Sequence, residues 1–319
     1  MMGLLLIRDK IKNFYGQYEF LTMAAIKFIL IITGLFIIKN NIGYMESIEK
    51  TYIIVAISLL CAFIPMSLVV LVLAVIILAN IYVLSMQLAL TVLGILLVMF
   101  ILYFRFSPKE GLLLIITPML FFLKIPYVIP LVVGLIGTPF SCVAVAFGTM
   151  AYYMIYLISS NAATIRNIKS DSFTTQIEFF MNLLVENKAM IISIVIFTVV
   201  IVVVYVIKRM SINNSWATAV GAGGVLELIM FIATYSMAKT GTDLIFIVIG
   251  WVFSLALAFI LQFFIFSVDY SRTEHTQFED DEYYYYVKAV PKITVIAPEM
   301  NIKRINAQRN KIKTKNNKK

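Results

Sequence analysis

Long apolar runs, separated by short polar segments, make up most of the first 266 residues of the chain. A helix needs about 20 apolar residues to cross the hydrocarbon core of a bilayer. Eight runs come close to that length, and the run at 52–66 is the shortest of them. They lie at 21–38, 52–66, 68–84, 88–104, 139–157, 190–207, 216–237 and 244–266. The pattern predicts an all-α polytopic membrane protein with about eight transmembrane helices.

A ninth apolar stretch, at 111–137, is broken. Pro118 and Pro126 interrupt it, and the charged Lys124 lies near its centre. Residues 112–123 would form about 18 Å of helix, which reaches a little past the middle of a core about 30 Å thick. The stretch is therefore predicted to be either a re-entrant pair of half-helices or two short crossings. We favour the re-entrant hairpin, whose non-helical backbone other protein or a water-filled cavity must cover.

The composition agrees with a membrane location. The chain is 61% hydrophobic and 13% charged, whereas soluble domains carry about 25% charged residues. If the eight runs alternate from a cytoplasmic N-terminus, 18 of the 26 Lys and Arg residues fall on the cytoplasmic side and 6 fall outside. Basic residues favour the cytoplasmic side. We therefore expect a plasma-membrane protein with both termini in the cytoplasm, in which 111–137 returns to the side it left.

Three ionisable residues lie well within the apolar runs, namely Lys27, Lys124 and Glu227. Lys27 is near the start of its run, so its side chain can reach the interface. Glu227 is near the middle of its run, where a carboxylate must be protonated, paired or hydrated. Gly223 and Gly224 precede it by one turn on the same helical face, and small residues let another helix approach closely. The spacing predicts that Glu227 points into a helix contact.

These residues define a predicted substrate or coupling site, which consists of Lys124 and Glu227 together with the helix-breaking Pro118 and Pro126. A Lys124–Glu227 pair would neutralise both charges, and Lys27–Glu227 is the rival pairing. Removing one member of a buried pair strands the other charge and destabilises the protein. The structural alternative is that Glu227 is only a polar link between two helices.

The segment 159–188 is the longest polar connection between runs. Ile177, Phe180 and Leu184 recur at helical spacing, and Thr175 and Glu178 match a capping box. We expect an amphipathic helix on the outer membrane surface, with a simple connector as the alternative.

The composition changes after Ser267, so we divide the chain into a transmembrane domain at 1–268 and a cytoplasmic tail at 269–319. Aromatic and β-branched residues predict short strands around the tyrosine run and at 293–296. Such a pair is marginal alone and favours a protein partner, with a predicted partner-binding set of Glu279, Asp280, Asp281, Tyr283 and Tyr285. The basic end at 303–319 is predicted to be disordered and attracted to anionic inner-leaflet lipid.

The tail sequence FEDDEYYYYVKAVPK at 278–292, together with Phe14-Tyr15-Gly16 and Ile125-Pro126-Tyr127-Val128, resembles an uncharacterised family of multi-pass membrane proteins from Gram-positive bacteria. The resemblance implies a membrane location. It implies no established activity and assigns no role to any residue.

Catalytic chemistry has little support in the sequence. The single histidine, His275, lies in the tail, Cys61 and Cys142 lie in apolar runs, and neither a nucleophile motif nor a phosphate loop is present. We expect no metal, no cofactor and no nucleic-acid partner. The favoured function is a permease- or transporter-like protein with a polar site at mid-membrane. The alternative is a membrane scaffold or cell-envelope assembly factor that recruits a protein through its tail, and self-association into a homo-oligomer stays open in both.

Overall fold

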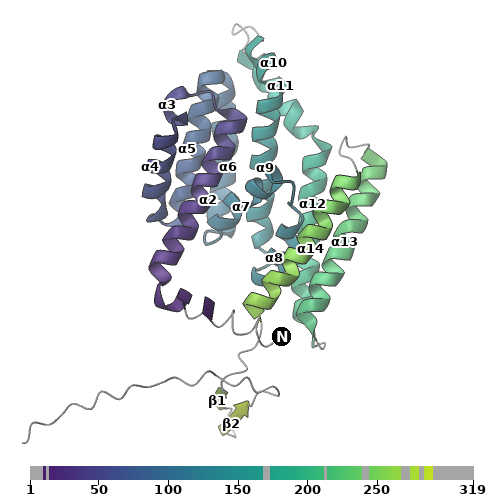
Figure 1. Ribbon diagram of the computed structural model, residues 1–319. Helices are drawn as coiled ribbons and strands as arrows, with labels where there is room; N and C mark the ends of the chain where they lie inside the picture. The colour runs from purple at the N-terminus through teal and green to yellow at the C-terminus, as the bar shows by residue number, and fades with distance from the viewer. Residues whose placement is uncertain are drawn as a thin grey trace, which may run out of the picture. The chain divides into compact units, whose positions relative to one another are not determined.

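The computed structural model describes residues 10–11, 14–167, 173–211, 214–238, 244–266, 274–279 and 284–289. The chain divides into two compact units, Leu5–Phe266 and a smaller unit of Met1–Leu4 with Ser267–Lys319. The first unit contains helices α2 (Glu19–Ile42), α3 (Glu46–Glu49), α4 (Thr51–Ala62), α5 (Met66–Leu84), α6 (Met86–Phe106), α7 (Gly111–Phe122), α8 (Val128–Ile136), α9 (Ser141–Ser160), α10 (Ala162–Asn167), α11 (Phe173–Val185), α12 (Lys188–Lys208), α13 (Ser215–Ala238) and α14 (Leu244–Phe266), as Figure 1 shows.

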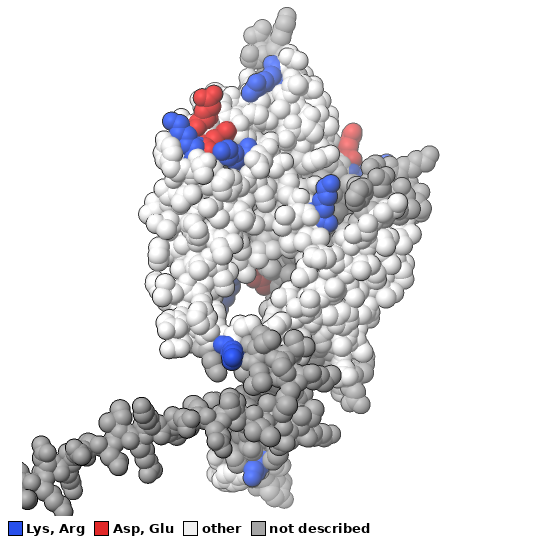
Figure 2. Space-filling view, in the orientation of Figure 1, with Lys and Arg blue, Asp and Glu red and all other residues white. Residues whose placement is uncertain are grey.

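Among the described residues, seven helices are long and apolar enough to cross a membrane: α2, α5, α6, α9, α12, α13 and α14. Figure 2 shows a face on which charged side chains are few and most of the described surface between them is uncharged. These helices confirm the predicted all-α, multi-pass membrane protein. Their exposed apolar side chains imply contact with the lipid bilayer.

The predicted helix at 52–66 is shorter in the structure. α4 has 12 residues and ends at Ala62, which gives a length of about 18 Å. Pro65 has no N–H group and disfavours a helical conformation in the residue before it, so the helix cannot continue through this position. The described part of the chain therefore has seven long apolar helices, and α4 ends four residues before the end of the predicted run at 52–66.

The broken stretch at 111–137 folds as a hairpin of two short helices. α7 has 12 residues and α8 has 9, so they extend about 18 and 14 Å. The flanking residues meet where the hairpin begins and ends. Ser107 donates a hydrogen bond to the carbonyl oxygen of Phe140 at 2.8 Å, and Ser141 donates one to the carboxylate of Glu110.

The helices of the first unit share two separate hydrophobic cores. The first core is built mainly from α2, α4, α5, α6, α7, α9 and α11, and the second mainly from α8, α12, α13 and α14. Figure 1 shows α2, α4, α5 and α6 in purple and blue on one side, α13 and α14 in green on the other, and the teal α7 and α9 between them. α7 packs against both cores, with Ile115 in the first and Leu120 and Phe121 against the second, whereas Leu131 of α8 belongs to the second. The hairpin therefore lies where the two cores meet.

A helix, α11, lies in the long connection before α12. Its Phe180 and Leu184 are buried, and its Gln176 accepts a hydrogen bond from Ser85 at 2.6 Å. The helix begins at Phe173, before Thr175, so the predicted capping box with Thr175 as the capping residue is wrong.

The second unit contains strands β1 (Glu274–Glu279) and β2 (Tyr284–Ala289), which pair in antiparallel register with Phe278 opposite Tyr285. The tyrosine run forms the predicted strand, but its partner is β1. The second predicted strand, at 293–296, and the basic end at 303–319 lie outside the described residues. Polar residues dominate β1, so hydrophobicity gives no signal for it.

Candidate functional site

Glu227 lies on α13 and is fully buried, with 0% of its surface exposed. Neither oxygen of its carboxyl group has a hydrogen-bond partner among the described residues. Buried polar side chains in folded proteins almost always have such a partner, and an exception calls for an explanation. Glu227 is therefore the most unusual of the predicted site residues.

Gly223 and Gly224 bring neighbouring helices close to α13 on either side of the Glu227 turn. A Cβ atom on Gly223 would overlap the Val204 side chain of α12. A Cβ atom on Gly224 would lie 2.6 Å from Leu255 of α14. The carbonyl oxygen of Gly224 also accepts a hydrogen bond from the Trp251 indole at 2.8 Å. These close approaches bury the face of α13 that carries Glu227.

The apex of the α7–α8 hairpin lies beside this face. Tyr127, at the apex, interacts electrostatically with Glu227, and its ring packs edge-on against Phe231 of α13 at 5.0 Å. Gly250 of α14 lies against the apex as well, because a Cβ atom there would be 3.1 Å from the carbonyl oxygen of Lys124. The hairpin apex, α13 and α14 therefore meet around Glu227.

A second buried polar group occurs on α14. Ser254 is fully buried, and its hydroxyl has no hydrogen-bond partner among the described residues. It follows Gly250 by one turn on the same helical face. Glu227, Ser254 and the side-chain oxygen of Gln262 are thus buried polar groups of α13 and α14 without a hydrogen-bond partner among the described residues.

The two lysines proposed as partners of Glu227 make no hydrogen bond to its carboxyl oxygens. Lys27 donates to the carbonyl oxygen of Ile64 at 3.3 Å, near the end of α4. Lys124 is exposed at the hairpin apex and has a positive φ of 62°, which few residues other than glycine adopt. The charge pairing of Glu227 with a lysine stays a prediction.

The two predicted prolines lie at different parts of the hairpin. Pro118 is inside α7, where it removes one helical hydrogen bond. Pro126 is buried just before α8, and its carbonyl oxygen accepts a hydrogen bond from the Ile129 amide at 3.0 Å. Pro126 therefore belongs to the start of the second half-helix, near Tyr127.

A lysine from a neighbouring helix also meets the carbonyl end of α8, an arrangement that the sequence analysis did not predict. Lys208 of α12 donates to the carbonyl oxygens of Leu135 at 2.8 Å and Gly137 at 3.3 Å. Unpaired carbonyl groups at a helix end attract cations. In the sequence, Lys208 and Arg209 end an apolar run. Basic residues at that position indicate the orientation of the helix in the membrane, but they do not predict a contact with α8.

The base of the hairpin contains a second carboxyl group, Glu110. Burial raises the pKa of Glu110, and the hydrogen bond from Ser141 partly offsets that rise. The Ser141 hydroxyl also accepts a hydrogen bond from the Thr138 amide at 3.0 Å. This cluster joins the residue before α7 to the residues that follow α8.

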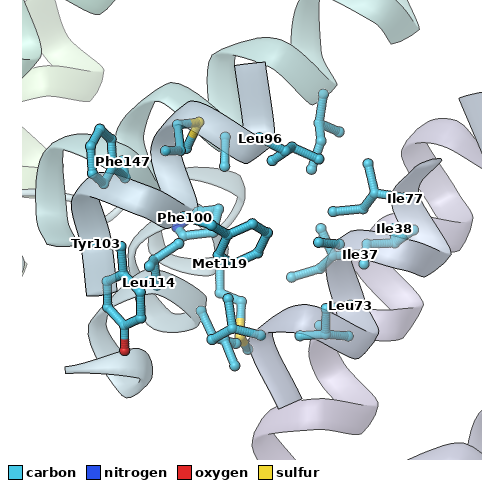
Figure 3. Close-up of a pocket in the computed structure, with 18 of the residues that line it drawn as sticks. Ile37, Ile38, Leu73, Ile77, Leu96, Phe100, Tyr103, Leu114, Met119 and Phe147 are labelled. Atoms are coloured by element: carbon cyan, nitrogen blue, oxygen red, sulfur yellow. The ribbon is translucent and has the colours of Figure 1, made fainter. Parts of the chain in front are cut away.

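An apolar cavity of about 90 Å³ lies between α2, α5, α6, α7 and α9. Figure 3 shows Phe100 and Leu114 on one side of this space and Ile37 and Leu73 on the other. Pro118 is among its lining residues. The cavity belongs to the first core and does not include Glu227.

Part of the predicted tail site is described. Glu279 pairs with Tyr284, and Tyr285 pairs with Phe278, across the two strands. Asp280, Asp281 and Tyr283 lie outside the described residues. Within the described ranges, no group of three His, Cys, Asp or Glu side chains is placed to hold a metal ion.

Comparisons with known proteins find no relatives. No family model matches the chain, and neither the curated proteins nor the solved structures contain a match. The resemblance of the tail to a Gram-positive membrane family stays a prediction.

Proposed function

We propose that the chain is a permease- or transporter-like membrane protein and that Glu227, beside the apex of the α7–α8 hairpin, is its coupling site. The observation that carries this proposal is the fully buried carboxyl group of Glu227, whose oxygens have no hydrogen-bond partner among the described residues. Ionisable groups within transmembrane segments are rare and mark ion or substrate pathways.

The proposed arrangement in the membrane places the hairpin as a re-entrant element. α7 and α8 are each too short to cross a core about 30 Å thick, and the hydrogen bond between Ser107 and Phe140 holds their outer ends together. Residues 51–65 are the proposed eighth crossing, because they run back along α2 as far as Ile64, which accepts a hydrogen bond from Lys27 near the start of α2. Both termini then lie in the cytoplasm, and the site lies in the plasma membrane.

The position of the hairpin where two cores meet supports a transport role. Since α7 packs against both cores and α8 in the second, any displacement of one core relative to the other acts on the hairpin. Several transporter folds place their binding sites where broken helices meet at mid-membrane, and they move one helix bundle against another. Glu227 stands at the corresponding place in this chain.

A purely structural role for Glu227 has less support. A polar residue that links two helices does so through a hydrogen bond to the other helix. The link between α13 and α14 is made instead by Trp251 and the carbonyl oxygen of Gly224, at 2.8 Å. Glu227 does not contribute a hydrogen bond to it.

Electrical recording from proteoliposomes on a solid-supported membrane tests the proposal. The membrane is exposed in turn to amino acids, sugars, nucleosides, organic acids and inorganic ions at several pH values. We expect a transient current with at least one class in the wild-type protein and its loss in Glu227→Gln. The absence of current with every class, from protein that is folded in the liposomes, would contradict a transport function.

The β1–β2 hairpin supports a second candidate, a scaffold that recruits a cytoplasmic protein. A two-stranded sheet leaves one edge of each strand without a partner strand, and Tyr284 and Tyr286 are largely exposed. Deletion of 269–319 separates the two candidates. A transporter keeps its substrate current after the deletion, whereas a scaffold loses the protein that co-purifies with the full-length chain.

A further inference from the structure

The surroundings of Glu227 bring few charged or titratable groups to its carboxyl. From the hairpin apex, Tyr127 interacts with it electrostatically, and Lys124 belongs to the same apex. From α9, Tyr153 stands behind Tyr127 and interacts with that phenol. The residues of α12 and α14 nearest to Gly223 and Gly224, one turn before Glu227, are Val200, Val204, Trp251 and Leu255, and none of these four is ionisable. An isolated carboxylate in such a site is far less stable than a protonated carboxyl group.

Hydroxyl-bearing side chains lie between the turn of Glu227 and the beginning of α12. The Tyr127 ring packs against Phe231, one turn after Glu227, at 5.0 Å, and its phenol is close enough to Glu227 and Tyr153 for their charges to interact. The Tyr153 hydroxyl lies 3.4 Å from the hydroxyl of Ser193. Ser193 is buried near the start of α12 and donates to the carbonyl oxygen of Ala189 at 2.8 Å. These side chains come from the hairpin, α9 and α12, and only the folded structure brings them together.

Aromatic rings flank this series of hydroxyls. Phe121 lies 5.9 Å from Tyr153 between ring centroids, and Phe231 lies 5.0 Å from Tyr127. Phe197 lies between these two phenylalanines, 5.7 and 6.1 Å from them. Metal cations such as Ca²⁺ take six or more oxygen ligands. One carboxyl group and scattered hydroxyls among apolar rings suit a proton better.

We propose that Glu227 is a proton-binding site, reached from the Lys188 end of α12 through the hydroxyls of Ser193, Tyr153 and Tyr127. This inference rests on the proposed transport function, in which the proton is then the coupling ion. Water at the Lys188 end gives one proton to Ser193, and each hydroxyl passes its own proton to the next group. Water must bridge Tyr127 and Glu227, whose oxygens accept no hydrogen bond from the described residues. The Glu227 carboxylate gains one proton, and every hydroxyl ends with the one proton it had.

Infrared spectroscopy of the protein in liposomes tests the binding site without any transported substrate. We expect a protonated carboxyl C=O band at neutral pH that is absent from Glu227→Gln and present in Glu110→Gln, the control at the base of the hairpin. In the wild-type protein the band should decrease reversibly as the pH is raised, a result that does not depend on the folding of a variant. A wild-type spectrum without this band, or its removal by Na⁺ at constant pH, would overturn the proposal.

The exchange of this carboxyl proton with D₂O tests the route. Tyr153→Phe removes one hydroxyl and keeps the ring, and Tyr152→Phe makes the same change at the neighbouring residue, whose ring stacks on Phe121 at 4.7 Å. We expect exchange to be about fivefold slower in Tyr153→Phe than in Tyr152→Phe. A factor of about five corresponds to the loss of one hydrogen bond with a net contribution of about 1 kcal/mol. Equal rates would exclude the route. If the band is present but no substrate current is found, the proton site stands and the transport function fails.

Discussion

The side-chain amine of Lys208, at the end of α12, donates a hydrogen bond to the carbonyl oxygen of Leu135 in α8 at 2.8 Å. It donates a second one to Gly137 at 3.3 Å. The last carbonyl groups of a helix have no partner within that helix. Lys208 therefore ties the second half of the hairpin to the long helix beside it, and this contact holds α8 in the second core.

Lys208→Met should lower the free energy of unfolding by about 1.5 kcal/mol, near the lower end for hydrogen bonds from charged groups, because Lys208 is only partly buried. Arg209→Met is the matched control. Both cations lie over the Tyr205 ring, at 4.6 and 4.5 Å, but only Lys208 donates to the α8 carbonyls. Thermal unfolding in detergent measures the difference, and equal losses in the two variants would show that the α8 contact adds no stability.

Glu110 should make the stability of the protein depend on pH. Burial raises its pKa in the folded state above the ordinary value of 4.5, so between those two values the folded protein binds more protons than the unfolded chain. By linkage, this group's contribution is fully present below about pH 4.5 and is lost as the pH rises through its folded pKa. Glu110→Gln should therefore flatten the profile of thermal stability against pH.

Ser141→Ala should change the same profile of thermal stability against pH. The Ser141 hydroxyl donates to the Glu110 carboxylate and so lowers the pKa of Glu110. Its removal should raise that pKa further and extend the loss of stability to higher pH. A profile that is unchanged in both variants would rule out Glu110 as its origin.

Gly223→Ala should destabilise the contact between α13 and α12. The new methyl group would overlap the Val204 side chain, and overpacking of this kind costs about 1–3 kcal/mol. Gly221→Ala, half a turn away on the same helix, is the control, because no atom lies within 4 Å of its added Cβ. It should be neutral or stabilising, since alanine favours the helix by about 1 kcal/mol over glycine. Equal unfolding temperatures for the two variants would contradict the close packing at Gly223.

Lys124 allows the backbone and the charge at the apex to be tested separately. Its φ of 62° suits glycine and costs other residues about 1 kcal/mol. Lys124→Gly should therefore be about 1 kcal/mol more stable than Lys124→Ala, as measured by thermal unfolding. Both variants lack the ammonium group, so a role for that charge in transport predicts equal loss of the substrate current in the two.

The sequence predicts the long helices well, because an apolar run of about 20 residues has one stable form in a bilayer. It also locates the hairpin, since Pro118 and Pro126 leave runs too short to span. The predicted helix at 52–66 is too long at its end, because the residues up to Met66 are apolar whereas Pro65 ends α4 at Ala62.

The sequence does not predict which segments come together around Glu227. Hydrophobicity does not distinguish a side chain that faces lipid from one that faces another helix, so the sequence does not show that the hairpin packs where two cores meet. Glu227 stands out as a charge in an apolar run, and Gly223 and Gly224 indicate a helix contact. Tyr127 comes from a distant segment, and no spacing rule connects it to Glu227.

The depth of the hairpin apex in the membrane is the most direct test of the proposed site beside Glu227. In a background with Cys61→Ala and Cys142→Ala, a single cysteine at position 124 is treated with a membrane-impermeant maleimide from outside intact cells, and a cysteine at position 188 serves as the control. Lys188 is exposed at the start of α12, on the side that the account places outside. A re-entrant hairpin predicts rapid labelling at 188 and slow or absent labelling at 124. Labelling at 124 as rapid as at 188 would place the apex in an external loop and contradict a mid-membrane site beside Glu227.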